Sequence, residues 1–324
     1  MKQSPGNPHM QMLGGMDYTT RPFLLPPDKW RLLHNMRCRD TKIEEVPLKA
    51  VFGYVIPQSN ETLLALANLP AGYRNYGSLV GLTETKVFNT SVVYSTELKQ
   101  FGATLTLEKD EKYRRWSTCV HNGYLFFTNP INCVRYTDGA EVLPMGASTL
   151  ADPVGVAPSG RYVTVFFDHL VIGSPTIRGC DNPTWVMWSH LHNYANFIPG
   201  TASEADHYIC TEYQSEMDTI VGLTGMTLFK NLCLLFTCNA VYSMRYTGLP
   251  RVMRVDPLIT EFGSGFFYGV ARLNDAVAWI DDRHQDFFMF RGNGPEAFGG
   301  PIKDYFFADL STNPDYRQRL WNYV

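Results

Sequence analysis

The segment NGYLFFTNPINCVRYTDG, residues 122–139, holds two short apolar stretches joined by a polar turn, and it ends at a glycine. The same order of apolar strand, turn, aromatic-containing strand and glycine returns in NLCLLFTCNAVYSMRYTG at 231–248 and in NDAVAWIDDRHQDFFMFRG at 274–292. More degenerate copies are RYVTVFFDHLVIGSPTIRG at 161–179 and GSLVGLTETKVFNTS at 77–91. Five copies of one supersecondary unit indicate a repeat architecture.

The spacing of the copies indicates which repeat architecture this is. Successive turn centres lie 45, 44, 66 and 43 residues apart, at Glu84, Asn129, Gly173, Asn239 and Asp282. Three of these intervals match the ~40–50-residue period of a β-propeller blade built from about four strands. An insertion near residues 175–210 accounts for the long interval. We therefore predict five blades, with a sixth available if the two chain ends share one.

The strands themselves favour the same fold. Both alternate faces are apolar in Tyr124–Phe127 and in Leu232–Phe236, which predicts strands covered on both sides, as in a blade between two neighbours. Buried parallel strands would look similar, but they need long amphipathic helices between them. Helical periodicity is confined to short pieces near 26–35 and 315–323. The prediction is an all-β, β-propeller-like fold of antiparallel strands.

The first 45 residues differ in composition from the rest of the chain and are rich in Met, Pro and Gly. We interpret residues 1–45 as an extended N-terminal arm that packs on the propeller or on a neighbouring subunit, with Trp30 as its apolar anchor. Residues 46–324 then form the propeller-like domain.

Composition and charge exclude several classes of protein. The net charge of −3 argues against tight duplex binding, which needs many Lys and Arg side chains to displace phosphate counterions. No apolar run approaches the ~20 residues that span a bilayer, and the start lacks the apolar core of a secretory signal. The seven cysteines are scattered and include no CxxC pair, so we expect buried, reduced thiols in a protein made in the cytoplasm.

Three constellations could suggest chemistry, and each has a simpler structural interpretation. Asp281–His284 groups two acids with a histidine, yet it falls between two strands and predicts a turn. His190 and His192 would share a strand face with Trp188, but a metal site needs a third ligand. The glycine-rich 292–301 stretch lacks the context of a phosphate loop and is interpreted as a connecting loop. No catalytic, metal-binding or cofactor-binding residue is predicted.

Four stretches carry a resemblance to a known family. RRWSTCVHNGYLFFTNPINCVRYTDGAEVLPM at 114–145 resembles the phage tail nozzle proteins, also called tail tubular protein B. FFDHLVIG at 166–173, followed by WSHLHNYANFIPGTASEAD at 188–206, is similar to that family, with Phe197 where a Trp often stands. LLFTCNAVYSMRYTGLPRVMRV at 234–255 and DDRHQDFFMFRGNGPEAFGGPIKDYFFADL at 281–310 resemble further blades of the family.

The resemblance implies a structural, non-enzymatic virion protein, assembled in the host cytoplasm. It would form a ring in the tail, with a hexamer the expected stoichiometry. The ring would contact the adaptor and portal-proximal proteins and the tail fibres. Genomic DNA would pass through its lumen without specific binding, and no cofactor is implied. Aromatic residues are common at interface cores, which makes these the expected subunit contacts: Trp30, Tyr194, Phe197, Phe266, Phe267 and Tyr268.

Two alternatives stay open. A phage-associated propeller glycan hydrolase would need two carboxylates across a sugar bond, and sequence alone cannot locate such a pair. A monomeric propeller that binds a receptor or another partner would need one exposed aromatic patch and no self-assembly.

Overall fold

The computed structural model describes most of the chain beyond residue 115 and separate strands before it. The described residues are 36–39, 42–45, 65–69, 78–83, 86–90, 95–100, 115–145, 148–149, 158–177, 179–200, 203–210 and 222–312. The chain divides into one unit of residues 1–53 with 299–314 and a second of residues 54–298 with 315–324.

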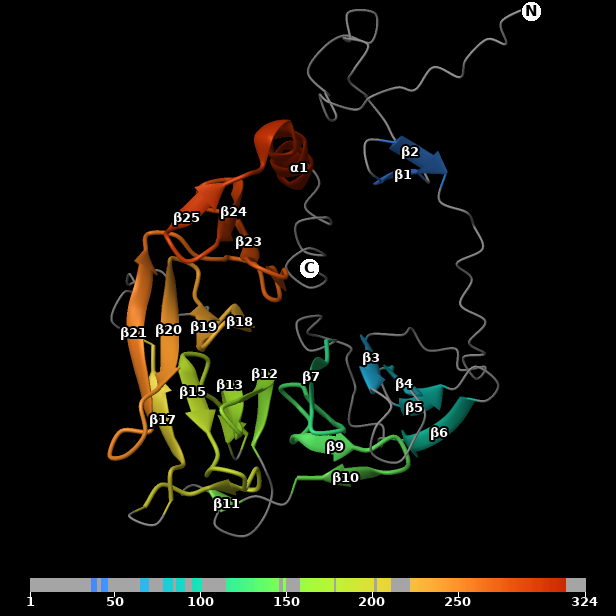
Figure 1. The fold of residues 1–324 in the computed structure, drawn as a ribbon, viewed down its shortest axis with the longest axis vertical. Helices are drawn as coiled ribbons and strands as arrows, with labels where there is room; N and C mark the ends of the chain where they lie inside the picture. Colours follow the sequence, from blue (N-terminus) through green and yellow to red (C-terminus); the bar gives the residue numbers. More distant parts are fainter. Residues whose placement is uncertain are drawn as a thin grey trace, which may run out of the picture. The chain divides into compact units, whose positions relative to one another are not determined.

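The second unit is built from five antiparallel sheets that follow one another along the chain (Figure 1). The first blade is formed by β3 (Ala65–Leu69), β4 (Ser78–Leu82), β5 (Lys86–Thr90) and β6 (Ser95–Gln100). The second is formed by β7 (Ser117–His121), β8 (Tyr124–Thr128), β9 (Arg135–Thr137) and β10 (Val142–Pro144). The third has β12 (Ser159–Phe166), β13 (His169–Ile177), the short β14 (Cys180–Asp181), β15 (Trp185–Trp188) and β17 (Asp206–Ile209).

The last two blades have the same order. The fourth is formed by β18 (Gly225–Phe229), β19 (Leu232–Phe236), β20 (Ala240–Tyr246) and β21 (Met253–Thr260). The fifth is formed by β22 (Val270–Arg272), β23 (Val277–Asp281), β24 (Asp286–Phe290) and β25 (Pro295–Ala297). In each sheet the first strand pairs with the second, and the last strand lies at an edge. The predicted all-β, β-propeller-like fold is confirmed.

The first strands of successive blades lie beside one another, β3 with β7, β7 with β12, β12 with β18 and β18 with β22. A separate apolar core then forms between each neighbouring pair of blades. In β19, Cys233 and Leu235 belong to the core shared with the third blade, while Leu234 and Phe236 belong to the core shared with the fifth. This alternation is why the strand is apolar on both faces, as its sequence predicts.

In the first, second and fourth blades, the turn between the second and third strands contains the same threonine hydrogen bond. Thr83, Thr128 and Thr237 are fully buried at the end of their strands. Each hydroxyl donates to a carbonyl three or four residues ahead, at 2.9–3.2 Å. Buried backbone acceptors in the turn are therefore satisfied without water.

These turns also bind the next blade. The Nε1–H of Trp116 donates to the Thr83 carbonyl at 2.8 Å. The Ser264 N–H donates to the Thr237 carbonyl at 2.9 Å. These two hydrogen bonds join the first and the fourth blade to the segments that lead into the second and the fifth.

The turn predicted at Gly173 is wrong. Gly173 lies inside β13 opposite Tyr162, and a Cβ there would lie 3.3 Å from the Tyr162 side chain. The glycine allows close approach of an aromatic ring and does not mark a turn. The third blade instead turns between β13 and β15, in a segment that carries β14. Its long connection runs from Ser189 to Ala205 and holds β16 (Asn196–Phe197), which pairs in parallel with β11 (Ser148–Thr149).

The first unit contains a hairpin of β1 (Met36–Arg39) and β2 (Lys42–Glu45), together with α1 (Gly300–Thr312). The hairpin lies within the segment predicted as an extended arm, while residues 1–35 with Trp30 lie outside the described residues. The predicted helical pieces at 26–35 and 315–323 also lie outside them. The stretch at 292–301 is more than a connecting loop, because it contains β25 and the start of α1.

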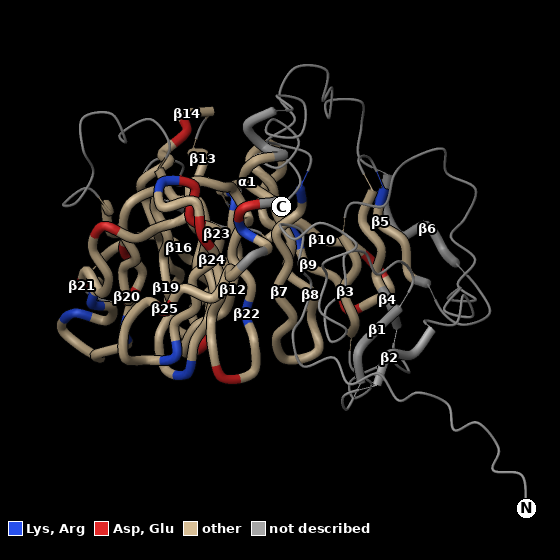
Figure 2. Tube along the Cα trace, turned by 90° about the horizontal axis from the view of Figure 1, so that it is seen from above, with Lys and Arg blue, Asp and Glu red and all other residues tan. Residues whose placement is uncertain are grey.

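Charged residues of both signs are interspersed along the described chain and gather mainly at the turns (Figure 2). Most strand positions of the blades carry uncharged residues, with exceptions such as Arg161 in β12 and Arg254 in β21. Among the described residues, no helix has the length and apolar character to cross a bilayer.

Candidate functional site

A groove of about 1060 Å³ lies between the third and fourth blades. Its sides are the last strands of the two sheets, β17 and β21. Its ends are formed by residues 199–200 and 203–205 of the long β15–β17 connection and by the β20–β21 loop at 249–252. We call this cavity the third–fourth groove.

The third-blade wall is polar and aromatic. Val186 pairs with Tyr208 and Trp188 pairs with Asp206, and paired residues in adjacent strands share a face. Val186, Trp188 and Tyr208 pack in the core shared with the fourth blade, which places Asp206 on the same side. Asp206 is exposed, with 59% of its side chain accessible, so its carboxylate lies at the open part of the wall.

The fourth-blade wall combines apolar and charged residues. Val252, Met253 and Val255 are buried in the same core and also line the groove. Leu249, in the loop above them, is 76% exposed, the largest value among the exposed apolar residues that the structure describes. The charged residues of this wall are Arg251, Arg254 and Asp256.

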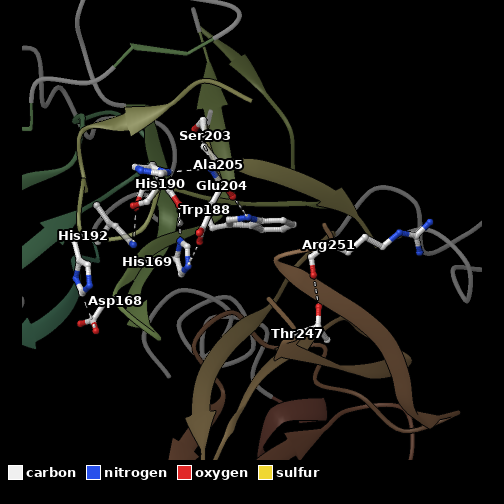
Figure 3. A network of polar contacts seen from close by, with 12 residues as sticks. Asp168, His169, Trp188, His190, His192, Ser203, Glu204, Ala205, Thr247 and Arg251 are labelled. Carbon is white, nitrogen blue, oxygen red and sulfur yellow. Dashed lines mark hydrogen bonds and ion pairs between the residues drawn. The ribbon is translucent and has the colours of Figure 1, made fainter. Parts of the chain in front are cut away.

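Glu204 is held at the groove by three residues of the third blade (Figure 3). The Nε1–H of Trp188 donates to its carbonyl at 2.9 Å, and its own N–H donates to Nδ1 of His190 at 3.0 Å. Its carboxylate Oε2 lies 3.4 Å from Nε2 of His169. The side chain of Arg251 extends away from Glu204.

His169 is fully buried, and its tautomer follows from its surroundings. Nδ1 lies 2.7 Å from the Ser189 carbonyl, which can only accept, so Nδ1 carries the proton. In the neutral ring Nε2 then has only a lone pair, and within the described part of the chain neither Nε2 nor Glu204 Oε2 has a hydrogen-bond partner. Burial lowers the pKa of His169, while the Ser189 hydrogen bond and the Glu204 carboxylate act in the opposite direction. The contact between Nε2 and the Glu204 carboxylate is an ion pair only when the ring is protonated.

A second acid–histidine group lies at the tip of the β12–β13 hairpin. Asp168 Oδ1 lies 3.0 Å from Nε2 of His121, in the neighbouring blade, and Oδ2 lies 3.9 Å from Nδ1 of His192. Next to it, exposed Phe167 stacks on Tyr246 of the fourth blade, with centroids 5.2 Å apart and planes 16° apart. Both contacts join the hairpin tip of the third blade to its neighbours.

The expected histidine pair does not lie on one strand face. β15 ends at Trp188, so His190 and His192 belong to the connection that follows, and they point to different partners. Across the described ranges, no group of three or more His, Cys, Asp and Glu side chains is arranged to hold a metal ion.

The turn at Asp281–His284 is confirmed. The fully buried Asp281 carboxylate accepts from the N–H groups of Arg283 and His284 at 2.9 Å and contacts the His284 ring at 2.9 Å. It also accepts from Gly263 N–H at 3.3 Å. The acid closes a turn and binds the segment that leads into the first strand of its own blade.

The predicted interface aromatics divide into two groups. Phe197 and Phe266 are buried, each 2% exposed, so their side chains pack inside the chain and offer no contact surface as folded here. Tyr194, Phe267 and Tyr268 are half-buried. Burial raises the pKa of Tyr268 to about 12, and its hydroxyl donates to the Arg161 carbonyl at 3.0 Å. An interface role for these three stays a prediction.

The cysteines that can be assigned differ in exposure. Cys119, Cys133 and Cys233 are free thiols whose pKa burial raises above the ordinary value. Cys180 in β14 is exposed, unlike the buried thiol that composition leads us to expect.

No family model and no curated protein sequence match the chain. Among solved structures it is similar to BamB from Moraxella catarrhalis, at 11% identity over 66% of this chain and 53% of that one, with a TM-score of 0.37. It is also similar to a chain of a nidogen/laminin complex, at 10% identity over 71% and 76%, TM-score 0.38. A third is YCF48 bound to D1 peptide, at 10% identity over 70% and 65%, TM-score 0.38.

The chain thus spans about half the length of the BamB chain that it matches. These neighbours are β-propeller proteins, the class that the five sheets define by their own order and packing.

Proposed function

We propose that this protein is a non-enzymatic β-propeller module that works by binding another protein, with the third–fourth groove as its contact surface. The observation that carries the proposal is the groove itself, an open cavity bounded by the last strands of two neighbouring blades. Among the described strands, β17 pairs only with β15 and β21 only with β20. Each therefore offers an unpaired edge to another chain.

The roles of the acidic and histidine side chains support a binding function. Asp281 closes a turn, Asp168 joins two blades through His121, and Glu204 is fixed by the third blade. A general acid or base must instead lie within reach of a substrate proton. In these three places the carboxylate serves the architecture or faces the groove wall.

A finer form of the proposal is a subunit of a phage tail ring. Its support is the sequence resemblance to the tail nozzle family. The resembling stretch 114–145 contains the second blade, and 234–255 covers most of β19–β21. In this form the partner would be a second copy of the chain or an adjoining tail protein, and the site would be the virion.

Mass photometry of the full-length chain tests the finer form. A closed ring gives a single multiple of the 36.8 kDa chain mass, and negative-stain images show a central opening. A strict monomer at micromolar concentration, absent from virions, would contradict the tail ring and leave the binding module. Release of reducing ends from a host-surface polysaccharide by the purified chain would contradict the non-enzymatic proposal altogether.

A further inference from the structure

We infer that Asn293 is a site of spontaneous deamidation, at which the folded protein converts an asparagine into aspartate and isoaspartate. The inference is independent of the proposed partner-binding function, because Asn293 lies in the fifth blade, between β24 and β25. An asparagine followed by glycine is prone to this reaction, since glycine has no side chain to hinder its own main-chain nitrogen. The chain contains two such pairs, Asn122–Gly123 and Asn293–Gly294, and the structure holds them differently.

The reaction needs only water as a co-reactant. The main-chain nitrogen of Gly294 gives up its proton and attacks Cγ of Asn293, which closes a cyclic imide. The bond from Cγ to Nδ2 breaks, and Nδ2 leaves with that proton as ammonia. Water then opens the imide: addition at Cγ gives aspartate, whereas addition at the main-chain carbonyl carbon gives isoaspartate, in which the chain continues through Cγ. The net change is the gain of water and the loss of ammonia, with no oxidation or reduction.

The loop around Asn293 leaves this attack free. Asn293 is exposed, and within the part of the chain that the structure describes neither it nor Gly294 makes a hydrogen bond. A Cβ built on Gly294 would meet nothing within 4 Å, so the space around this residue is open. Gly292 and Gly294 have φ values of 121° and 147°, and glycine has wide conformational freedom. The Gly294 nitrogen can therefore move over the Asn293 side chain without breaking a described hydrogen bond.

The other Asn-Gly pair is held in a hairpin turn. Asn122 and Gly123 have φ values of 48° and 77° and form the two-residue connection between β7 and β8. Positive φ at both positions is the geometry of a type I′ turn, and the paired residues His121 and Tyr124 close it. The Asn122 side chain is also hydrogen-bonded to Tyr194. Closing the imide requires the Asn122 backbone to leave the left-handed region, so this hairpin must open first.

Exposure does not distinguish the two asparagines, because both are exposed. The difference lies in the backbone: one pair is fixed by a turn and a strand ladder, and the other lies in a loop without hydrogen bonds of its own. Asn293 should therefore react in the folded chain, whereas Asn122 should be protected by folding.

Deamidation would change the fifth blade locally. Asn293 lines a crevice of about 300 Å³ together with Phe262 and Phe290, so the product places a carboxylate beside apolar rings. Isoaspartate also adds a methylene group to the main chain of a turn whose strands meet at the Phe290–Pro295 pair. The third–fourth groove contains none of these residues and should stay as it is.

Peptide mapping by mass spectrometry tests the inference on the full-length chain, kept folded in a mildly alkaline buffer. Trypsin releases Asn293 in the peptide 292–303 and Asn122 in the peptide 116–135. Deamidation raises the mass of either peptide by about 1 Da. Asn293 should convert at nearly the same rate in the folded chain and in the chain unfolded by urea. Asn122 should convert about tenfold more slowly in the folded chain than in urea, because it reacts only when its hairpin opens.

Matched variants identify the source of the isoaspartate. An isoaspartyl methyltransferase transfers a labelled methyl group to isoaspartate in peptides from the aged, folded chain. Asn293→Gln should remove most of the label, because a glutamine side chain would have to close a larger ring, and Asn122→Gln should leave the label unchanged.

Three results would each overturn the inference: equal rates at the two asparagines in the folded chain, protection of Asn293 by folding as strong as that of Asn122, or a label that survives in Asn293→Gln. None of them bears on partner binding or ring formation, which mass photometry tests separately.

Discussion

Two crevices lie between the outer parts of neighbouring blades, and they differ about threefold in size. The third–fourth groove holds about 1060 Å³, whereas the crevice between β21 and the β24–β25 turn holds about 300 Å³. Both lie against β21, so one strand forms a side of each. The difference in volume therefore comes from the residues that face β21, which belong to the third blade in one crevice and to the fifth blade in the other.

Phe262, which lines the smaller crevice, belongs to a stack of rings. Phe262 stacks on His284 at 4.5 Å between centroids and meets Phe288 edge-on at 5.0 Å. Buried Asp281 orients His284 for this contact. In the third–fourth groove the corresponding wall carries Asp206 and Tyr208, and part of the long connection before β17 lines it. An aromatic stack therefore flanks the smaller crevice, whereas a polar strand flanks the larger one.

The largest expected loss of stability comes from changes in the two apolar cores on either side of the fourth blade. We expect the two cores to respond alike. Leu235 packs toward the third blade and Leu234 toward the fifth, and both are fully buried. Leu235→Ala and Leu234→Ala should each lower the free energy of unfolding by about 2–5 kcal/mol. Urea unfolding followed by tryptophan fluorescence measures both. A loss below ~1 kcal/mol in only one of them would show that the interfaces differ in their cores as well.

The second effect concerns the turn that Asp281 closes beside the smaller crevice. Asp281→Ala leaves the N–H groups of Arg283, His284 and Gly263 without their acceptor and releases the His284 ring. We expect a loss of about 3 kcal/mol, because several buried donors lose their partner together. Hydrogen exchange should rise at residues 262–264 and 282–288, while residues 203–210 keep their protection. Equal loosening of both crevices would contradict the separate roles assigned to the two walls.

The sequence predicts the blades well because burial on both faces leaves a local signal. Leu232–Phe236 is apolar at every position, since alternate side chains enter two different cores. Asp281 is also identifiable, because an acid followed by polar residues between two strands is a common turn signal.

The groove could not be predicted in this way. Glu204 is one acid in a connection, and its significance depends on His169 and Trp188, which reach it only through the sheet. No local pattern marks such contacts. Gly173 was predicted to mark a turn, but it lies in a strand, where the absence of a side chain allows Tyr162 to approach. The residue type alone does not distinguish these two roles. The aromatic residues Phe197 and Phe266 were expected at a surface but fill the core, since composition does not distinguish the two.

A smaller effect concerns the groove wall. Trp188→Phe keeps the buried ring but removes the donor to the Glu204 carbonyl. We expect about 1 kcal/mol of lost stability, the net value of one hydrogen bond. Faster amide exchange should be confined to residues 203–206. Phe288→Leu, which acts on the other crevice, is the matched comparison and should leave those amides unchanged.

The smallest expected effect is on the pH dependence of the free energy of unfolding. Burial lowers the pKa of His169 from 6.5, so below that pH the unfolded chain binds more protons than the folded one. Stability should therefore fall as pH drops below about 6.5, and His169→Asn, which keeps a donor for Ser189, should flatten that slope. Thermal unfolding between pH 5 and 8, for both proteins, measures it. An unchanged slope in the variant would assign the acid sensitivity to another group.

Hydrogen exchange of the full-length chain, compared between the free chain and the chain assembled with a second copy or bound to its partner, is the most direct test of the groove as a binding site. We expect new protection in residues 205–209 and 253–257, the two strands beside the third–fourth groove, and none in residues 290–295 beside the smaller crevice. Protection at residues 290–295, or none at β17 and β21 in the bound state, would contradict the groove as the binding site.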